Sequence, residues 1–146
     1  MRILVLALLL PLGCVETQAS ILRQHATAVS ELQAKADQAL PQDRCFLYAE
    51  LVSRMTDIAG LQFGTGDLAA GEETLKLVQE YALKLKASIG DDSKKLKLAE
   101  TLLRQTSFRL EGILHEASYE NRVALEMTLK QVNNVQTQLM MQVFKK

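Results

Sequence analysis

Apolar residues recur every three or four positions along almost the whole chain, which is the spacing of one face of an α-helix. No stretch alternates apolar and polar residues over the length of a β-strand. Proline occurs only at Pro11 and Pro41, so roughly the last hundred residues contain no helix breaker of this kind. The pattern therefore predicts an all-α protein.

Breaks in the pattern divide the chain into about five helices. The first covers roughly residues 20–39, and the second begins near Pro41 or Asp43, because proline suits the first turn of a helix. The segment Gly64–Asp67 ends the second helix, since glycine adopts a left-handed C-cap and aspartate caps the helix that follows. The third helix is then expected over residues 67–89.

The second half of the chain continues in the same way. Gly90 is a predicted C-cap, and residues 91–93 are predicted N-caps of a fourth helix that extends to about Ala117. Ser118 is expected to cap a fifth helix ending near Val143, although one kinked helix over this region is the alternative. Links of about two to four residues place neighbouring helices antiparallel. We therefore expect a compact bundle or stacked helical hairpins.

The second helix is predicted to be the central one. Its apolar positions form a stripe that is wider than one neighbouring helix can cover. They are Tyr48, Leu51, Met55 and Ile58, widened by Leu47, Val52 and Ala59.

The N-terminal segment has the pattern of a secretory signal peptide. Arg2 precedes the apolar run Ile3–Leu10, which is too short to span a bilayer. The tripeptide Thr17–Ala19 places small residues where a signal peptidase reads them. We expect residues 1–19 to be the signal peptide and residues 20–146 to form a single helical domain, in the periplasm or outside the cell.

Cys14 offers an alternative, in which it becomes the lipid-modified first residue of an envelope protein. Gly13 before it fits the bacterial lipobox, whereas Pro11 stands where that motif has leucine. The signal-peptide interpretation is therefore preferred, and it removes Cys14 from the mature chain. Neither alternative leaves an integral membrane segment after processing.

The charge balance argues against nucleic acid as a partner. Lys plus Arg and Asp plus Glu number 17 each, whereas a phosphate-binding protein needs an excess of basic residues. The basic run from Lys94 to Lys97 is interpreted as a solvated helix start. A hydrophobic content of 48% excludes a disordered chain.

Few side chains fit catalytic or metal-binding chemistry. Cys45 is the only cysteine left after signal removal, and we interpret it as a small apolar residue of a helix. Glu111 and His115 are four residues apart and occur once, whereas a di-iron bundle needs Glu-x-x-His twice. His25 lies among core positions and is expected to be a packed or rim histidine rather than a metal ligand. We expect no cofactor and no enzymatic activity, with an unrecognised hydrolase as the least favoured alternative.

The segment LMMQVF, residues 139–144, is apolar on nearly every side. The predicted core stripe of the fifth helix consists of Leu125, Leu129, Val132, Gln136, Leu139 and Val143. Met141 points away from this stripe. Burial against several helices is one explanation, and an adaptable Met-rich surface for a protein partner or for self-association is the other. Met140, Met141 and Phe144 are the candidate residues of such a surface.

The sequence MTDIAGLQFGTGDLAAGEETLKLVQEYALKL resembles a degenerate tetratricopeptide repeat, a helical hairpin of about 34 residues. Gly66-Asp67 matches the turn of the repeat, and Ala59 and Gly71 match its small residues. The resemblance, at about residues 55–88, implies a helical hairpin with peptide binding as its associated function.

Three further segments, PQDRCFLYAEL, KKLKLAETLLRQTSFRL and QVFKK, resemble uncharacterised exported proteins of acidobacterial type. That similarity implies the compartment and the helical fold rather than an activity. The sequence thus predicts an exported, non-enzymatic helical protein that acts as an interaction module in the cell envelope. The alternative is a periplasmic carrier or chaperone that holds apolar ligands in a groove between helices.

Overall fold

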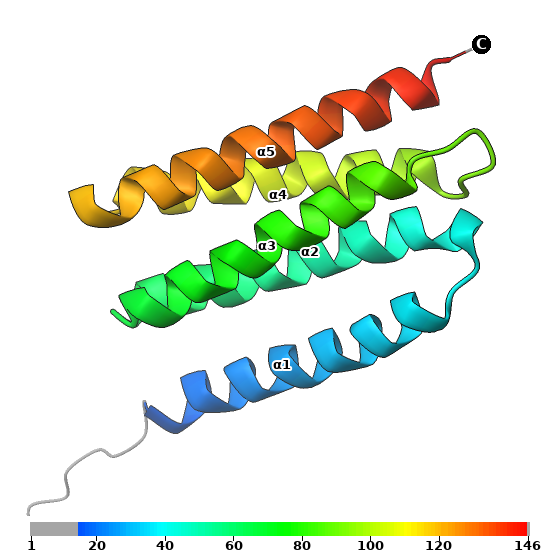
Figure 1. The fold of residues 1–146 in the computed structure, drawn as a ribbon. Helices are drawn as coiled ribbons and strands as arrows, with labels where there is room; N and C mark the ends of the chain where they lie inside the picture. The colour runs from blue at the N-terminus through cyan, green and yellow to red at the C-terminus, as the bar shows by residue number, and fades with distance from the viewer. Residues whose placement is uncertain (1–14, 146) are drawn as a thin grey trace, which may run out of the picture.

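The computed structural model describes residues 15–145, with side chains from residue 18 onward, and contains five helices (Figure 1). They are α1 (Val15–Gln38), α2 (Pro41–Gly64), α3 (Leu68–Ser88), α4 (Leu96–Glu116) and α5 (Tyr119–Val143). No strand occurs in this part of the chain. The predicted all-α fold with about five helices is confirmed.

Most of the predicted signal peptide, together with the alternative lipidation site Cys14, lies outside the described residues. The expected cleavage point between Ala19 and Ser20 falls within α1, which begins at Val15 rather than near Ser20. Processing and lipidation therefore stay predictions. Of the helices in residues 15–145, none combines the length and hydrophobicity that crossing a membrane requires.

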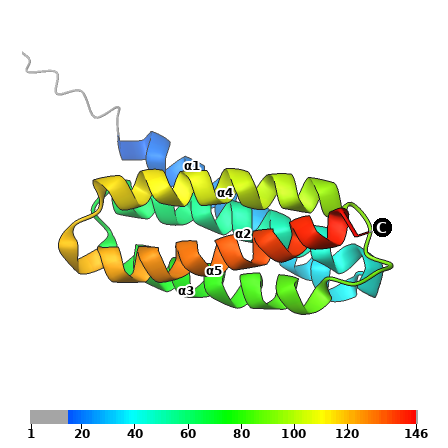
Figure 2. The ribbon, with the colours of Figure 1, turned by 90° about the horizontal axis from the view of Figure 1, so that it is seen from above.

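Two helical hairpins, α2–α3 and α4–α5, are stacked side by side with the same orientation (Figure 2). Along the stack α2 packs beside α4, and α3 packs beside α5. The consecutive helices α3 and α4 lie diagonally opposite each other, whereas an up-and-down bundle would make them neighbours. The structure is therefore a compact helical bundle in which the two hairpins are stacked, as the sequence predicted.

α2 is the central helix, as its wide apolar stripe predicted. It packs against α1, α3 and α4, and nine of its residues are buried. α1 forms a further layer beside α2 (Figure 1) and reaches α3 through a side chain, where Gln33 Nε2 donates a hydrogen bond to Tyr81 Oη at 3.0 Å. Of the side chains described for α1, only Val29 and Ala36 are buried, because this helix is covered along one narrow stripe.

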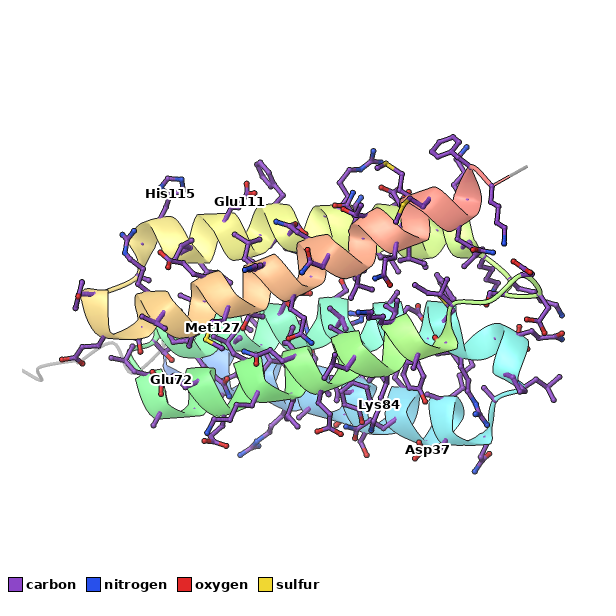
Figure 3. All side chains as sticks on the ribbon, turned by 45° about the horizontal axis from the view of Figure 1, so that its top comes forward. Asp37, Glu72, Lys84, Glu111, His115 and Met127 are labelled. Atoms are coloured by element: carbon purple, nitrogen blue, oxygen red, sulfur yellow. The ribbon has the colours of Figure 1, made fainter. Side chains whose placement is uncertain are left out.

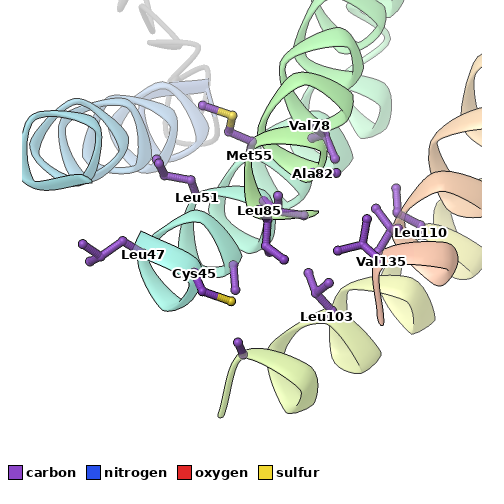
Figure 4. Close-up of a cluster of buried hydrophobic side chains, with 14 of the residues drawn as sticks. Cys45, Leu47, Leu51, Met55, Val78, Ala82, Leu85, Leu103, Leu110 and Val135 are labelled. Carbon is purple, nitrogen blue, oxygen red and sulfur yellow. The ribbon is translucent and has the colours of Figure 1, made fainter. Parts of the chain in front are cut away.

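Aliphatic side chains from all four helices of the two hairpins fill the core between them (Figure 4). Leu51, Leu85, Leu103 and Leu139 come from the four different helices, and each is fully buried. Removing one such side chain from water stabilises the fold by roughly 1.5–3 kcal/mol. This apolar burial holds the hairpins together.

The buried stripe of α5 differs in part from the predicted one. Thr128 and Val135 are buried, whereas Leu129 and Gln136 of the predicted stripe are half-buried. The difference arises because α5 packs against α3 as well as α4, which turns its core-facing side toward α3. The period of the helix was predicted correctly, and Leu125, Val132 and Leu139 are buried as predicted, but the centre of the buried face is rotated toward α3.

The turn between α2 and α3 has the geometry that Gly66 and Asp67 predict. Gly66 has a φ of +83°, the left-handed conformation that glycine adopts without steric cost. The Asp67 carboxylate accepts a hydrogen bond from the Ala70 N–H at 3.3 Å and so caps α3. The two helices then cross closely at Gly71, where a Cβ atom would lie 2.8 Å from the Phe63 ring. Small residues at these positions therefore permit the tight hairpin.

The link between α3 and α4 differs from the prediction. It comprises residues 89–95 and is longer than expected, because it leads to the diagonal position of the stack. Ile89, rather than Gly90, is the C-cap of α3. Lys95 precedes α4 with a φ of 58°, and the predicted N-caps, residues 91–93, lie inside the link.

The alternative of one kinked helix over the last fifty or so residues is wrong, because α4 and α5 are separate helices. Ala117 and Ser118 join them, and Ser118 occupies the N-cap position of α5 with extended backbone angles. Its Oγ accepts a hydrogen bond from Asn121 Nδ2 at 2.9 Å instead of from a backbone N–H. The predicted capping position is therefore correct, although the capping contact is to a side chain.

A polar cluster sets how α4 lies against α2. The Arg109 guanidinium of α4 forms an ion pair with Asp57 of α2, and it donates hydrogen bonds to Ser53 Oγ at 2.6 Å and to Thr106 Oγ at 3.2 Å. The side chains of Arg109 and Asp57 are 36% and 29% exposed, so water screens the pair only in part. The cluster therefore favours one register between two helices that are otherwise joined by non-directional apolar contacts.

Gly66→Val is expected to lower the free energy of unfolding by about 1–3 kcal/mol, because a β-branched residue is strained in the left-handed conformation. Gly64→Ala is the matched control, since Gly64 is the last residue of α2 and has open space at its Cβ position. It should change the free energy by less than about 0.5 kcal/mol. Thermal melts of both variants test this, and equal, negligible shifts would contradict the tight turn.

Asp57→Ala is expected to lower the free energy of unfolding by about 1–2 kcal/mol, because it leaves a partly buried guanidinium without its anion. Glu73→Ala, which breaks an exposed ion pair with Lys76, should leave the urea midpoint almost unchanged. The double variant Asp57→Leu with Arg109→Met should recover part of the loss, since it removes both charges. If the urea midpoint of Asp57→Ala equals that of Glu73→Ala, the cluster does not hold α4 to α2.

Candidate interaction surface

Exposed apolar side chains gather on the α4–α5 hairpin. Thirteen large hydrophobic residues are exposed in residues 18–145, and eight belong to this hairpin or its ends: Leu98, Phe108, Tyr119, Val123, Met127, Met140, Met141 and Phe144. One side of the hairpin packs on α2–α3, and no helix of residues 15–145 covers the other. The last unit of a stacked helical array normally has a polar outer face. Apolar groups exposed there are typical of a binding surface.

The last turn of α5 carries three of these side chains, Met140, Met141 and Phe144, which we call the terminal patch. Their exposed fractions are 41%, 61% and 76%, whereas the adjacent Leu139 is fully buried. Leu139 therefore anchors the helix in the core while its neighbours face outward. Burial against several helices, one of the two explanations for this apolar segment, does not account for these three residues.

Asp91 of the α3–α4 link holds this end of α5 in place. Its carboxylate accepts hydrogen bonds from Gln142 Nε2 at 2.8 Å and from Lys145 Nζ at 3.1 Å. The hydrogen bond from Gln142, followed by that from Lys145 and its charge, lowers the pKa of Asp91 below its ordinary value. Because the groups are exposed to water, these contacts orient the helix end more than they stabilise the fold.

The cavities along the described surface mix polar and apolar lining residues. One of about 360 Å³ lies between α1, α2 and the α3–α4 link, and Lys35, Lys94 and Lys95 line it together with Phe46. Lys95 Nζ lies 4.8 Å from the centre of the Phe46 ring. Lys94 and Lys95 belong to one basic run of the sequence, whereas Lys35 comes from a helix distant in the chain and could not be placed beside them from the sequence. A carrier of apolar ligands is better served by a predominantly apolar lining.

The two histidines lie on different helices. His25 of α1 is half-buried and lines a cavity of about 390 Å³ together with Asp57 and Arg109, so it is a residue of the rim rather than of the core. His115 and Glu111 are exposed on the side of α4 that faces away from the other helices (Figure 3). In residues 18–145 no three potential metal ligands among His, Cys, Asp and Glu lie close enough to hold an ion.

Cys45 is a free thiol on α2 that is completely buried in the core, where it occupies the place of a small apolar residue. Burial raises its pKa to about 11, and a hydrogen bond with Ser88 offsets part of that effect. A nucleophilic cysteine needs a lowered pKa and access to solvent. Cys45 therefore serves the packing of α2 against its neighbours.

Comparisons with known proteins do not add a family. No protein-family model matches the chain, and no curated protein and no solved structure matches it significantly. The resemblances to tetratricopeptide repeats and to exported acidobacterial proteins therefore stay predictions.

Cys45→Ser is expected to lower the free energy of unfolding at neutral pH by less than about 1.5 kcal/mol, because the side chains are similar in volume. The free energy of unfolding should also depend on pH differently in the wild-type chain and in this variant. An unfolded cysteine has a pKa of about 8.5, so above that pH the unfolded chain loses the proton while the folded chain, with a pKa of about 11, keeps it. The stability of the wild-type chain therefore falls as the pH rises through this interval, and the serine variant lacks that contribution.

Urea melts at about pH 7, 9 and 10 measure the gap in stability between the two chains, which should narrow with rising pH. The titration of tyrosines and lysines is common to both chains and cancels in the gap. A gap that is constant over this range would contradict the raised pKa.

Proposed function

We propose that this chain is an exported, non-enzymatic interaction module of the cell envelope, which binds a protein partner through the terminal patch. The observation that carries the proposal is the exposure of three large apolar side chains within one turn of a helix end that Asp91 holds in place. Covering such side chains is favourable by roughly 25 cal/mol for each Å² of apolar surface removed from water. A fixed helix end also reduces the entropy that binding costs.

The composition of the terminal patch suits a partner whose surface is irregular. Methionine is unbranched and polarisable, so Met140 and Met141 can adjust to different shapes, while Phe144 offers a rigid ring. Gln142 and Lys145 stand beside the three apolar residues and supply polar groups at the margin. An apolar centre with a polar rim is the usual anatomy of a protein interface.

Export is the part of the proposal that rests on the sequence alone. The supporting features are Arg2, the apolar run Ile3–Leu10 and the small residues of Thr17–Ala19. If residues 1–19 are removed in transit, the partner belongs to the periplasm or to the outside of the cell.

The other two candidate functions have less support. A carrier of apolar ligands is disfavoured because Lys35, Lys94 and Lys95 line the cavity that contains Phe46, and because the more apolar cavity at His25 is wide open to solvent. A hydrolase with a cysteine nucleophile is disfavoured because burial raises the pKa of Cys45 to about 11.

Photo-crosslinking in cells that express the full chain tests the proposal. A photoreactive phenylalanine analogue in place of Met141 should give a covalent adduct with one envelope protein. The matched control is the same analogue in place of Leu83 on α3, since Leu83 is exposed to a similar degree, 58% against 61%. We expect an adduct at position 141, none at position 83, and a mature N-terminus at Ser20 in the crosslinked chain.

Each part of the proposal can fail separately in this experiment. The absence of any adduct at position 141, or equal adducts at both positions, would refute the terminal patch as the binding surface. A chain that stays in the cytoplasm with its N-terminus intact, or one that is acylated at Cys14 in the membrane fraction, would refute export by signal cleavage.

A further inference from the structure

The outer face of α4 is a second exposed surface, and it does not include the terminal patch. It is the side of the helix on which Glu111 and His115 stand, away from the other helices (Figure 3). Phe108 lies in the middle of this face with 77% of its surface exposed. Gly112 follows one turn later, and there is open space where its Cβ atom would be. The centre of the face is therefore one protruding ring beside bare backbone.

Both residues are unfavourable on a helix that faces water. The ring of Phe108 stays hydrated, and glycine in a helix interior weakens the helix relative to alanine. Both become favourable when another helix covers them, because the ring is then desolvated and the glycine leaves room for a side chain of that helix. The centre of this face thus has the shape of a helix-packing surface.

The charges on the face are ordered along the helix. Lys97 and Arg104 precede Phe108, whereas Glu111 follows it, with His115 one turn further on. Within residues 18–145 neither Arg104 nor Glu111 takes part in an ion pair. A partner with charges of one sign would be complementary to only half of this face. A helix that carries the same order of basic residue, phenylalanine and acidic residue, and that runs antiparallel to α4, would be complementary to both halves.

We propose that the partner for this face is a second copy of the chain, with the two α4 helices antiparallel about a two-fold axis at Phe108. Arg104 lies four residues before Phe108 and Glu111 three residues after it, which is about 6 Å and 4.5 Å along the helix axis. The rotation therefore brings Arg104 of each copy within about 1.5 Å, measured along the axis, of Glu111 of the other copy. The ion pair forms twice, on either side of the two stacked phenylalanine rings.

This dimer goes beyond the proposed function and does not depend on it. The terminal patch on α5 takes no part in the contact, so a dimer through α4 leaves Met141 free for another protein. The two proposals can therefore fail independently.

Sedimentation velocity over a concentration series of the full chain tests the dimer. Arg104→Glu places like charges against Glu111 of the other copy, and Glu111→Arg does the same with Arg104, so each variant alone should dimerise at least about tenfold more weakly. An equimolar mixture of the two variants should dimerise again, because both pairs are then of opposite charge. Arg23→Glu, an exposed charge reversal on α1, is the matched control and should behave like the wild type.

Circular dichroism confirms that each variant is folded before the comparison. A wild-type chain that is monomeric at every concentration would overturn the proposal. So would single variants that dimerise like the Arg23 control, or a mixture that stays monomeric. Loss of the dimer on Met141→Ser but not on Arg104→Glu would place the self-contact on the terminal patch and would also overturn it.

Discussion

The burial of α2 on three sides is the constraint on which the rest of the structure depends. Its apolar positions extend around most of the helix, and no single neighbour can cover them. α3 covers one part through the tight hairpin, α1 covers a second, and α4 must lie beside α2 to cover the third. Since α3 already occupies its own side, the chain has to cross the end of the hairpin through residues 89–95 before α4 begins. The parallel stacking of the two hairpins follows from this requirement.

Apolar burial alone does not choose how far α4 slides along α2, because the hydrophobic effect has no direction. The ion pair between Arg109 and Asp57, with Ser53 Oγ as a further acceptor, supplies the directional contact. At the other end of the stack, Asp91 ties the last turn of α5 to the link that leads into α4. Polar contacts thus set the register that the apolar core leaves open.

The same arrangement explains where the exposed apolar groups lie. A hairpin at the end of a stack has one covered side and one free side, so any apolar residue on the free side faces water. On the α2–α3 hairpin the outer positions near α1 are partly shielded, whereas Phe108 of α4 and Met141 of α5 have no such neighbour. Although the net charge of the chain is zero, the charges along α4 are ordered: basic residues precede Phe108 and an acidic residue follows it. Local order of charge, rather than net charge, therefore distinguishes this face of α4.

The helices and the turn at Gly66 could be predicted from the sequence, because each depends on residues close together in the chain. Helical period is a local property, and so is the preference of glycine for a left-handed turn. The segment around Met140, Met141 and Phe144 is apolar on nearly every side, so its sequence is compatible with burial and with an exposed surface. Only the positions of the other helices show that these three side chains are exposed. The sequence did not predict the rotation of α5 toward α3, the pairing of Arg109 with Asp57, or the placement of Lys35 and Lys94 along one cavity. Each of these joins segments far apart in the chain, so it depends on which helices become neighbours, and that choice is made only when the whole core packs together.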